Sequence, residues 1–195
     1  MALWMGVDVG GKRKGFDAAL VDDSRLLRLE GGLSCDAVIE LVRTCRPALV
    51  GIDSPRRCAP DGHGSRTGER QLARSICGIR WTPERSRVEL DPYYAWVREG
   101  LALFDALSEL EADAIEVFPT ASWTRWQGTR GRRKRAAWSR RGLDELGLEG
   151  LPRRTNQDQR DAIAAAVTAR LHSHGATETI GEIVVPRVSR VRSSS

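Results

Sequence analysis

Five acidic residues stand in or beside strongly apolar segments of the chain, and these are the residues most able to do chemistry. They are Asp8, Asp53, Glu116, Asp158 and Asp161. A carboxylate is costly to bury unless a cation or hydrogen-bond donors compensate its charge. Hard divalent cations such as Mg²⁺ and Mn²⁺ prefer carboxylate and water oxygens as ligands. The pattern therefore predicts a carboxylate-bound Mg²⁺ or Mn²⁺ site, which suits phosphoryl displacement.

Two of these acids come at or near the ends of apolar segments that we expect to be strands. Asp8 lies in LWMGVDV, and Asp53 ends ALVGID. If the two strands are parallel neighbours, both carboxylates emerge at one edge of the sheet, where ligands of open α/β sheets gather. They would repel each other unless a cation lay between them. The alternative for each residue alone is a turn aspartate, because Gly10-Gly11 follows the first and Ser-Pro follows the second.

Asp158 and Asp161 stand three residues apart at the start of the last expected helix, so they share one helix face. Thr155 and Asp158 match a capping box, which explains Asp158 without any metal. Asp161 lies further into the helix and is the stronger prediction for a metal ligand. Glu116 could be a further ligand, could face outward from an edge strand, or could hold a nearby arginine.

The order of expected elements is three strands, a helix, a strand, a helix, a strand and a helix. The expected strands cover 3–9, 15–22, 25–31, 48–53 and 114–118, and the helices run from Ser34 to about Arg46, from Pro92 to about Glu111 and over 155–173. The first three strands are joined by short turns and predict an antiparallel meander. The order predicts an α/β protein of the ribonuclease H-like fold, with a mixed five-stranded sheet flanked by helices.

We expect a single domain over residues 1–187, with a long inserted loop at about 55–91. We also expect a short helix near 66–77 within this loop and an edge strand at 180–185. Residues 188–195 are expected to be a disordered tail.

The composition is that of a globular protein with a basic surface. Lys and Arg number 31 against 26 Asp and Glu, and the formal net charge is +5. A basic balance favours polyanions such as nucleic acid as partners, although it also serves solubility. The segments are too short to span a membrane and the N-terminus lacks a leader pattern, so we expect a cytoplasmic protein with no membrane partner. The spacing of the four cysteines predicts reduced thiols rather than a zinc site.

Two segments concentrate the basic residues, and we predict that they bind nucleic acid. Residues 120–142 hold eight Lys or Arg, three Trp and no acid. The predicted contacts are Arg56, Arg66, Arg70, Arg130, Arg132, Arg133, Lys134 and Arg135. The tryptophans could stack on exposed bases or pack inward from a helix. The arginines after Asp53 could instead pair with Glu69 and with the site aspartates.

Several motifs in sequence order resemble the domain of unknown function 429 family, which is described as predicted nucleases of the ribonuclease H fold. They are MGVDVGGKRKGFDAAL, GIDSP, IEVFP, DQRDAIAAAVTARL and IGEIVVP. A more distant likeness is to the RuvC Holliday-junction resolvases, whose first strand carries an aspartate followed by glycine and whose last helix opens with two aspartates three apart. RuvC proteins have a glutamate where this chain has Asp53, so a carboxylate is kept. The resemblance implies metal-dependent cleavage that leaves a 5′-phosphate and a 3′-hydroxyl.

Three functional hypotheses follow. The leading one is a metal-dependent nuclease with Asp8, Asp53, Asp158 and Asp161 as ligands, Asp8 bridging two metals. The second is a module that binds nucleic acid or protein on the same fold without cleavage. The third is a relative of actin-like phosphotransferases, which normally need two copies of this core, whereas 195 residues supply one.

Overall fold

The computed structural model describes residues 2–11 and 14–188. The expected tail at 188–195 falls, except for its first residue, outside the described residues. Seven strands form one mixed sheet: β1 (Trp4–Val9), β2 (Phe16–Val21), β3 (Leu26–Leu33), β4 (Leu49–Asp53), β5 (Ala114–Val117), β6 (Thr177–Ile180) and β7 (Ile183–Pro186). Their order in the sheet is β3-β2-β1-β4-β5-β7-β6. The first three strands are antiparallel, as the short turns predict, and β4 and β5 continue in parallel with β1.

The helices complete an α/β architecture. They are α1 (Cys35–Cys45), α2 (Thr67–Ser75), α3 (Arg85–Leu90), α4 (Ala95–Glu109), α5 (Pro119–Gln127), α6 (Arg135–Glu145) and α7 (Gln157–Ser173), and a 3₁₀ turn covers Pro92–Tyr94. Ser34 caps α1 as expected, since its side chain accepts a hydrogen bond from the backbone N–H of Ala37. The cap of α7 is Asn156 with Gln159, not the expected Thr155 with Asp158. The capping explanation for Asp158 therefore falls away.

The strand count corrects the expected five-stranded sheet. The segment that we expected to form one edge strand at 180–185 contains a turn at Gly181, where φ is +64°, and it separates two strands. The second of them, β7, pairs in parallel with β5, and β6 pairs back on β7 as the outer strand. A positive φ strains residues that carry a Cβ, so glycine is what allows the chain to reverse here.

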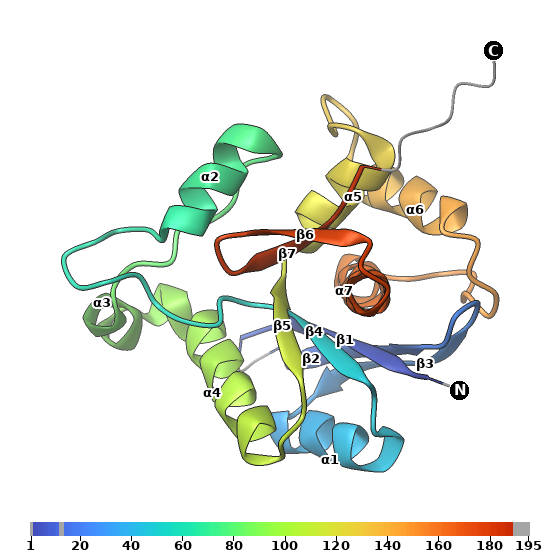
Figure 1. Ribbon diagram of the computed structural model, residues 1–195, viewed down its shortest axis with the longest axis horizontal. Helices are drawn as coiled ribbons and strands as arrows, with labels where there is room; N and C mark the ends of the chain where they lie inside the picture. Colours follow the sequence, from blue (N-terminus) through green and yellow to red (C-terminus); the bar gives the residue numbers. More distant parts are fainter. Residues whose placement is uncertain (1, 12–13, 189–195) are drawn as a thin grey trace.

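The sheet lies between two helical layers, as Figure 1 shows. Helices α1 and α4 cover one face, and alternate residues of β1 such as Met5 and Val7 pack against them. The central helix α7 covers the other face, with α5 and α6 packed on its outer side. Ten consecutive residues of α7, 160–169, are buried, so the middle of this helix is enclosed nearly all round and shows no single buried stripe.

Helix α7 approaches the sheet closely because two neighbouring strand residues are glycines. Gly6 of β1 and Gly51 of β4 are register partners. A Cβ on Gly6 would lie 2.1 Å from the backbone of Ala162, and one on Gly51 would lie 2.6 Å from that of Ala165. Any larger residue at either position would push the helix away from the sheet. These glycines therefore set how near the start of α7 comes to the ends of β1 and β4.

No helix among the described residues is long and apolar enough to cross a membrane.

Candidate metal and active site

The two strand acids lie side by side on the face of the sheet that α7 covers. Asp8 of β1 and Asp53 of β4 are register partners on parallel strands. Each stands two residues beyond one of the close-packed glycines, Gly6 and Gly51, and side chains two apart on a strand share a face. Both acids therefore point toward the beginning of α7, as the sequence predicted for neighbouring strand ends.

Helix α7 contributes the other two aspartates, Asp158 and Asp161, to the same cleft. Asp161, one turn before Ala165 on α7, is only 2% exposed. Its Oδ1 accepts hydrogen bonds from Trp123 Nε1 at 2.8 Å and from Gln157 Nε2 at 3.0 Å. Its Oδ2 accepts one from Arg135 at 2.7 Å. The buried donors fix the orientation of this carboxylate, and the arginine neutralises it.

Asp158 lies one turn nearer the start of α7 and forms an ion pair with Lys14, which follows β1. Its side chain is 19% exposed, so it faces the mouth of the site rather than the interior. The two helix acids thus differ in burial, and Asp161 is the more enclosed.

The charges of the four aspartates affect one another's ionisation. Burial, followed by the nearby charges of Asp161 and Asp158, raises the pKa of Asp8 to about 8. Burial, followed by Asp8 and Asp161, also raises the pKa of Asp53. The pKa of Asp161 is raised by burial, although Arg135 and the two neutral donors oppose this. Close carboxylates disfavour each other's ionised forms, and a cation between them relieves this repulsion.

These aspartates line a cleft of about 970 Å³. Lys14, Arg130 and Arg135 contribute its basic lining, and residues 76–80 with Thr82 form another part of its wall. Among the residues that the structure describes, no three His, Cys, Asp or Glu side chains stand close enough together to form a ready-made metal centre. The oxygens of Asp161 are already engaged, as described above. The donor set is nevertheless all carboxylate and self-repelling, which fits a hard divalent cation.

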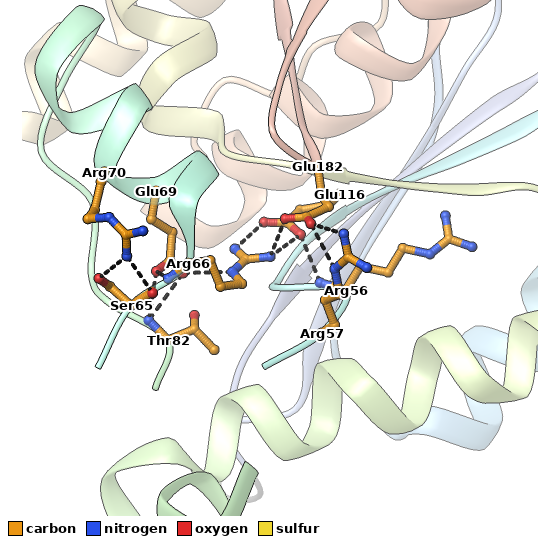
Figure 2. Close-up of polar contacts among 9 residues, drawn as sticks. All are labelled: Arg56, Arg57, Ser65, Arg66, Glu69, Arg70, Thr82, Glu116 and Glu182. Carbon is orange, nitrogen blue, oxygen red and sulfur yellow. Dashed lines mark hydrogen bonds and ion pairs between the residues drawn. The ribbon is translucent and has the colours of Figure 1, made fainter. Parts of the chain in front are cut away.

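Glu116 lies in the wall of the same cleft but is committed to an arginine, one of the alternatives that the sequence left open. Arg66 donates to its two carboxylate oxygens at 2.7 and 2.6 Å, and the backbone N–H of Arg56 donates to Oε2 at 2.8 Å. Arg66 also pairs with Glu69, which is 0% exposed and accepts from the backbone N–H of Thr82. Figure 2 shows this network joining β5 to α2 and its following segment. Both carboxylate oxygens of Glu116 are therefore engaged by Arg66 and by the backbone of Arg56.

The three arginines of the inserted segment that were expected to bind nucleic acid differ in burial and in hydrogen-bond partners. Arg66 is 3% exposed, so its burial does not fit the expected contact with nucleic acid. Arg56 is exposed, but its guanidinium binds the carbonyl of Ala114 and lies over the ring of Phe104. Arg70 is half-buried and donates to Ser65 and to a neighbouring threonine.

The basic side chains predicted as contacts in the second segment are exposed. The exposed basic side chains lie on the connection between α5 and α6 and at the start of α6: Arg130, Arg132, Arg133, Lys134 and Arg135. The first and last of them reach the cleft. Trp123 and Trp138 are buried in the core beside α7, so the inward-packing alternative holds for these two rings.

Several residues of the site had not been singled out from the sequence. Asp17 of β2 is the register partner of Asp8, is 4% exposed, and lies near Asp158 and the cap residue Asn156. The signal that could have identified it is an aspartate within an alternating strand, next to the strand that carries Asp8. Lys14 carried no comparable pattern, and Trp123 had been considered only for base stacking or inward packing, because the partners of both residues on α7 are distant in sequence.

The whole fold has counterparts among solved structures. The Thermus thermophilus RuvC structure matches with a TM-score of 0.52 and 14% identity, covering 91% of this chain and 98% of that one. T. thermophilus RuvC in complex with Holliday junction substrate matches with a TM-score of 0.51 and 17% identity, covering 90% and 97%. These similarities place the fold in the ribonuclease H-like class.

The family is defined by sequence. The family model "Protein of unknown function (DUF429)" matches residues 6–184, and the chain belongs to this family. This confirms the resemblance found in the motifs. No sequence among the curated proteins matches the chain.

Proposed function

We propose that the protein hydrolyses phosphodiester bonds of nucleic acid at a Mg²⁺ or Mn²⁺ site. The observation that carries the proposal is the convergence of Asp8, Asp53, Asp158 and Asp161 from three elements on one cleft. Asp8, Asp53, Asp158 and Asp161 would hold the metal. A bound divalent cation would supply an activated water and stabilise the leaving oxygen.

The protein's own residues prepare this chemistry in three ways. Trp123 and Gln157 hold Asp161 in one orientation. Burial of Asp8 and Asp53 in the cleft favours a cation over solvent as their partner. The exposed basic residues between α5 and α6 would hold the sugar-phosphate backbone across the cleft. A nucleic-acid substrate agrees with the structural neighbour that was solved with a Holliday junction.

The test is cleavage of labelled single-stranded, double-stranded and branched DNA, and of RNA, with Mn²⁺ and with EDTA. Asp8→Asn and Asp161→Asn should abolish metal-dependent cleavage, and Asp105→Asn, an exposed change on α4, should leave it intact. Cleavage that survives in both site variants, or that continues in EDTA, would refute the proposal.

A non-catalytic binding module on the same fold is the second candidate. The observation that favours it is the engagement of Asp161 by Arg135, which leaves this acid neutralised without a metal. In the same assay, retention of nucleic acid without cleavage by the wild-type protein under every metal condition would support this function instead.

A further inference from the structure

Two exposed cations, Lys14 and Arg135, pair with aspartates of the site, and both differ from the buried Arg66. Lys14 pairs with Asp158, and Arg135 pairs with Asp161. The side chains of Lys14 and Arg135 are 60% and 46% exposed, whereas those of their acids are 19% and 2% exposed. In each pair, the acid is fixed by the fold and the cation can turn into solvent.

Arg66, by contrast, is a cation that cannot leave its ion pairs for solvent. Its side chain is 4% exposed, and two buried glutamates, Glu69 and Glu116, hold it. Withdrawing it would strand two buried carboxylates, which is strongly unfavourable. Among the described residues, Lys14 and Arg135 each pair with a single acid, and these pairs are weaker because both cations are partly exposed to solvent.

From this contrast we propose that Lys14 and Arg135 are exchangeable counter-ions, which metal ions displace from Asp158 and Asp161 and which then bind substrate phosphate. The inference rests on the proposed function and adds two residues to it. Four ionised aspartates carry four negative charges, and these two side chains supply two positive ones. With both side chains in place, one divalent ion neutralises the two remaining negative charges. Two divalent ions neutralise all four aspartates, so a second ion fits the charge of the site only when both side chains have moved away.

The surroundings of the two cations permit this exchange. Arg135 begins α6, directly after an exposed connection that contains Gly128 and Gly131, both with positive φ. Lys14 lies in a turn between two strands and is followed by Gly15, again with positive φ. The donors Trp123 and Gln157 would keep Asp161 oriented after the arginine has left. Since both cations line the cleft, a phosphate bound there lies within their reach.

The experiment is a calorimetric titration of the metal-free full-length protein with Mn²⁺, without nucleic acid. The neutral variants Lys14→Gln and Arg135→Gln should bind Mn²⁺ about three- to tenfold more tightly, because a competing cation has been removed. Lys14→Arg and Arg135→Lys, which keep the charge, should bind close to the wild-type value. Unchanged or weaker Mn²⁺ binding in either neutral variant would overturn the proposal.

Binding of a labelled DNA duplex in Mn²⁺, over a series of salt concentrations before cleavage proceeds, tests the second half of the proposal. Arg135→Gln should lower the slope of log affinity against log salt by about 1, the effect of one lost phosphate contact. An unchanged slope would overturn the role in phosphate binding. If the wild-type protein binds no Mn²⁺ at all, the proposed function itself fails. If it binds Mn²⁺ through Asp8 and the neutral variants show no gain, only the exchange is refuted.

Discussion

Neutralising Asp8 should stabilise the metal-free protein above neutral pH. The pKa of Asp8 rises from 3.8 to about 8 in the folded protein, mainly through burial and then through Asp161 and Asp158. Between these two values, the folded state keeps a proton that the unfolded chain has released. The free energy of unfolding must therefore fall as the pH rises from about 4 to about 8. Asp8→Asn cannot ionise and removes this contribution.

The size of the effect follows from the pKa difference. Each pH unit is worth about 1.4 kcal/mol, so the full difference would cost the folded state at most about 6 kcal/mol above pH 8. Water entering the open cleft and ionisation of the neighbouring acids will reduce this. We expect Asp8→Asn to gain about 2–4 kcal/mol at pH 8.5 and much less at pH 5.

Urea unfolding in EDTA at pH 5, 7 and 8.5 measures this directly. Asp105→Asn is the matched control, because it removes an exposed carboxylate from α4, away from the cleft. Mn²⁺ should reverse the order by stabilising the wild-type protein and not Asp8→Asn, since a metal that binds the folded state adds to its stability. If Asp8→Asn is no more stable than wild type at pH 8.5, or keeps the wild-type pH dependence, the folded state does not raise the pKa of Asp8 as described.

Three further predictions concern the surroundings of the site. Trp123→Phe keeps a buried aromatic ring but removes the N–H that orients Asp161. Mn²⁺ affinity measured by calorimetry should therefore fall about 10- to 100-fold. An unchanged affinity would show that this hydrogen bond does not position the ligand. Glu116→Gln should lower the free energy of unfolding by about 3 kcal/mol, because it leaves the charge of buried Arg66 with less compensation. Its Mn²⁺ affinity should stay within about twofold of wild type. A large loss of affinity with little loss of stability would instead make Glu116 a ligand. Gly51→Ala forces a Cβ against α7, so the free energy of unfolding measured in urea should fall by about 1–3 kcal/mol. Mn²⁺ binding should weaken as well. A variant that is as stable as wild type and still binds Mn²⁺ would contradict the close approach of helix and sheet.

Much of the fold followed from local patterns. The apolar segments around Asp8 and Asp53 became neighbouring parallel strands, and Ser34 became the helix cap that its type predicted. Periodicity could not identify the C-terminal hairpin, because Gly181 divides a short apolar segment that is compatible with one strand. The cap of α7 was misplaced by one residue, since Thr155 and Asn156 are both good caps.

The sequence by itself determined the type and order of the acids, because a charge inside an apolar strand is visible without coordinates. It could not decide which basic residue serves which acid. Arg66 is committed to Glu116, 50 residues away, and Arg135 contacts Asp161, 26 residues away. Only the packing of α2 and α6 against the core selects these pairs, because arginines look alike in sequence and differ only in what the fold places beside them. That selection separates the glutamate that is locked in an ion pair from the aspartates that face the cleft.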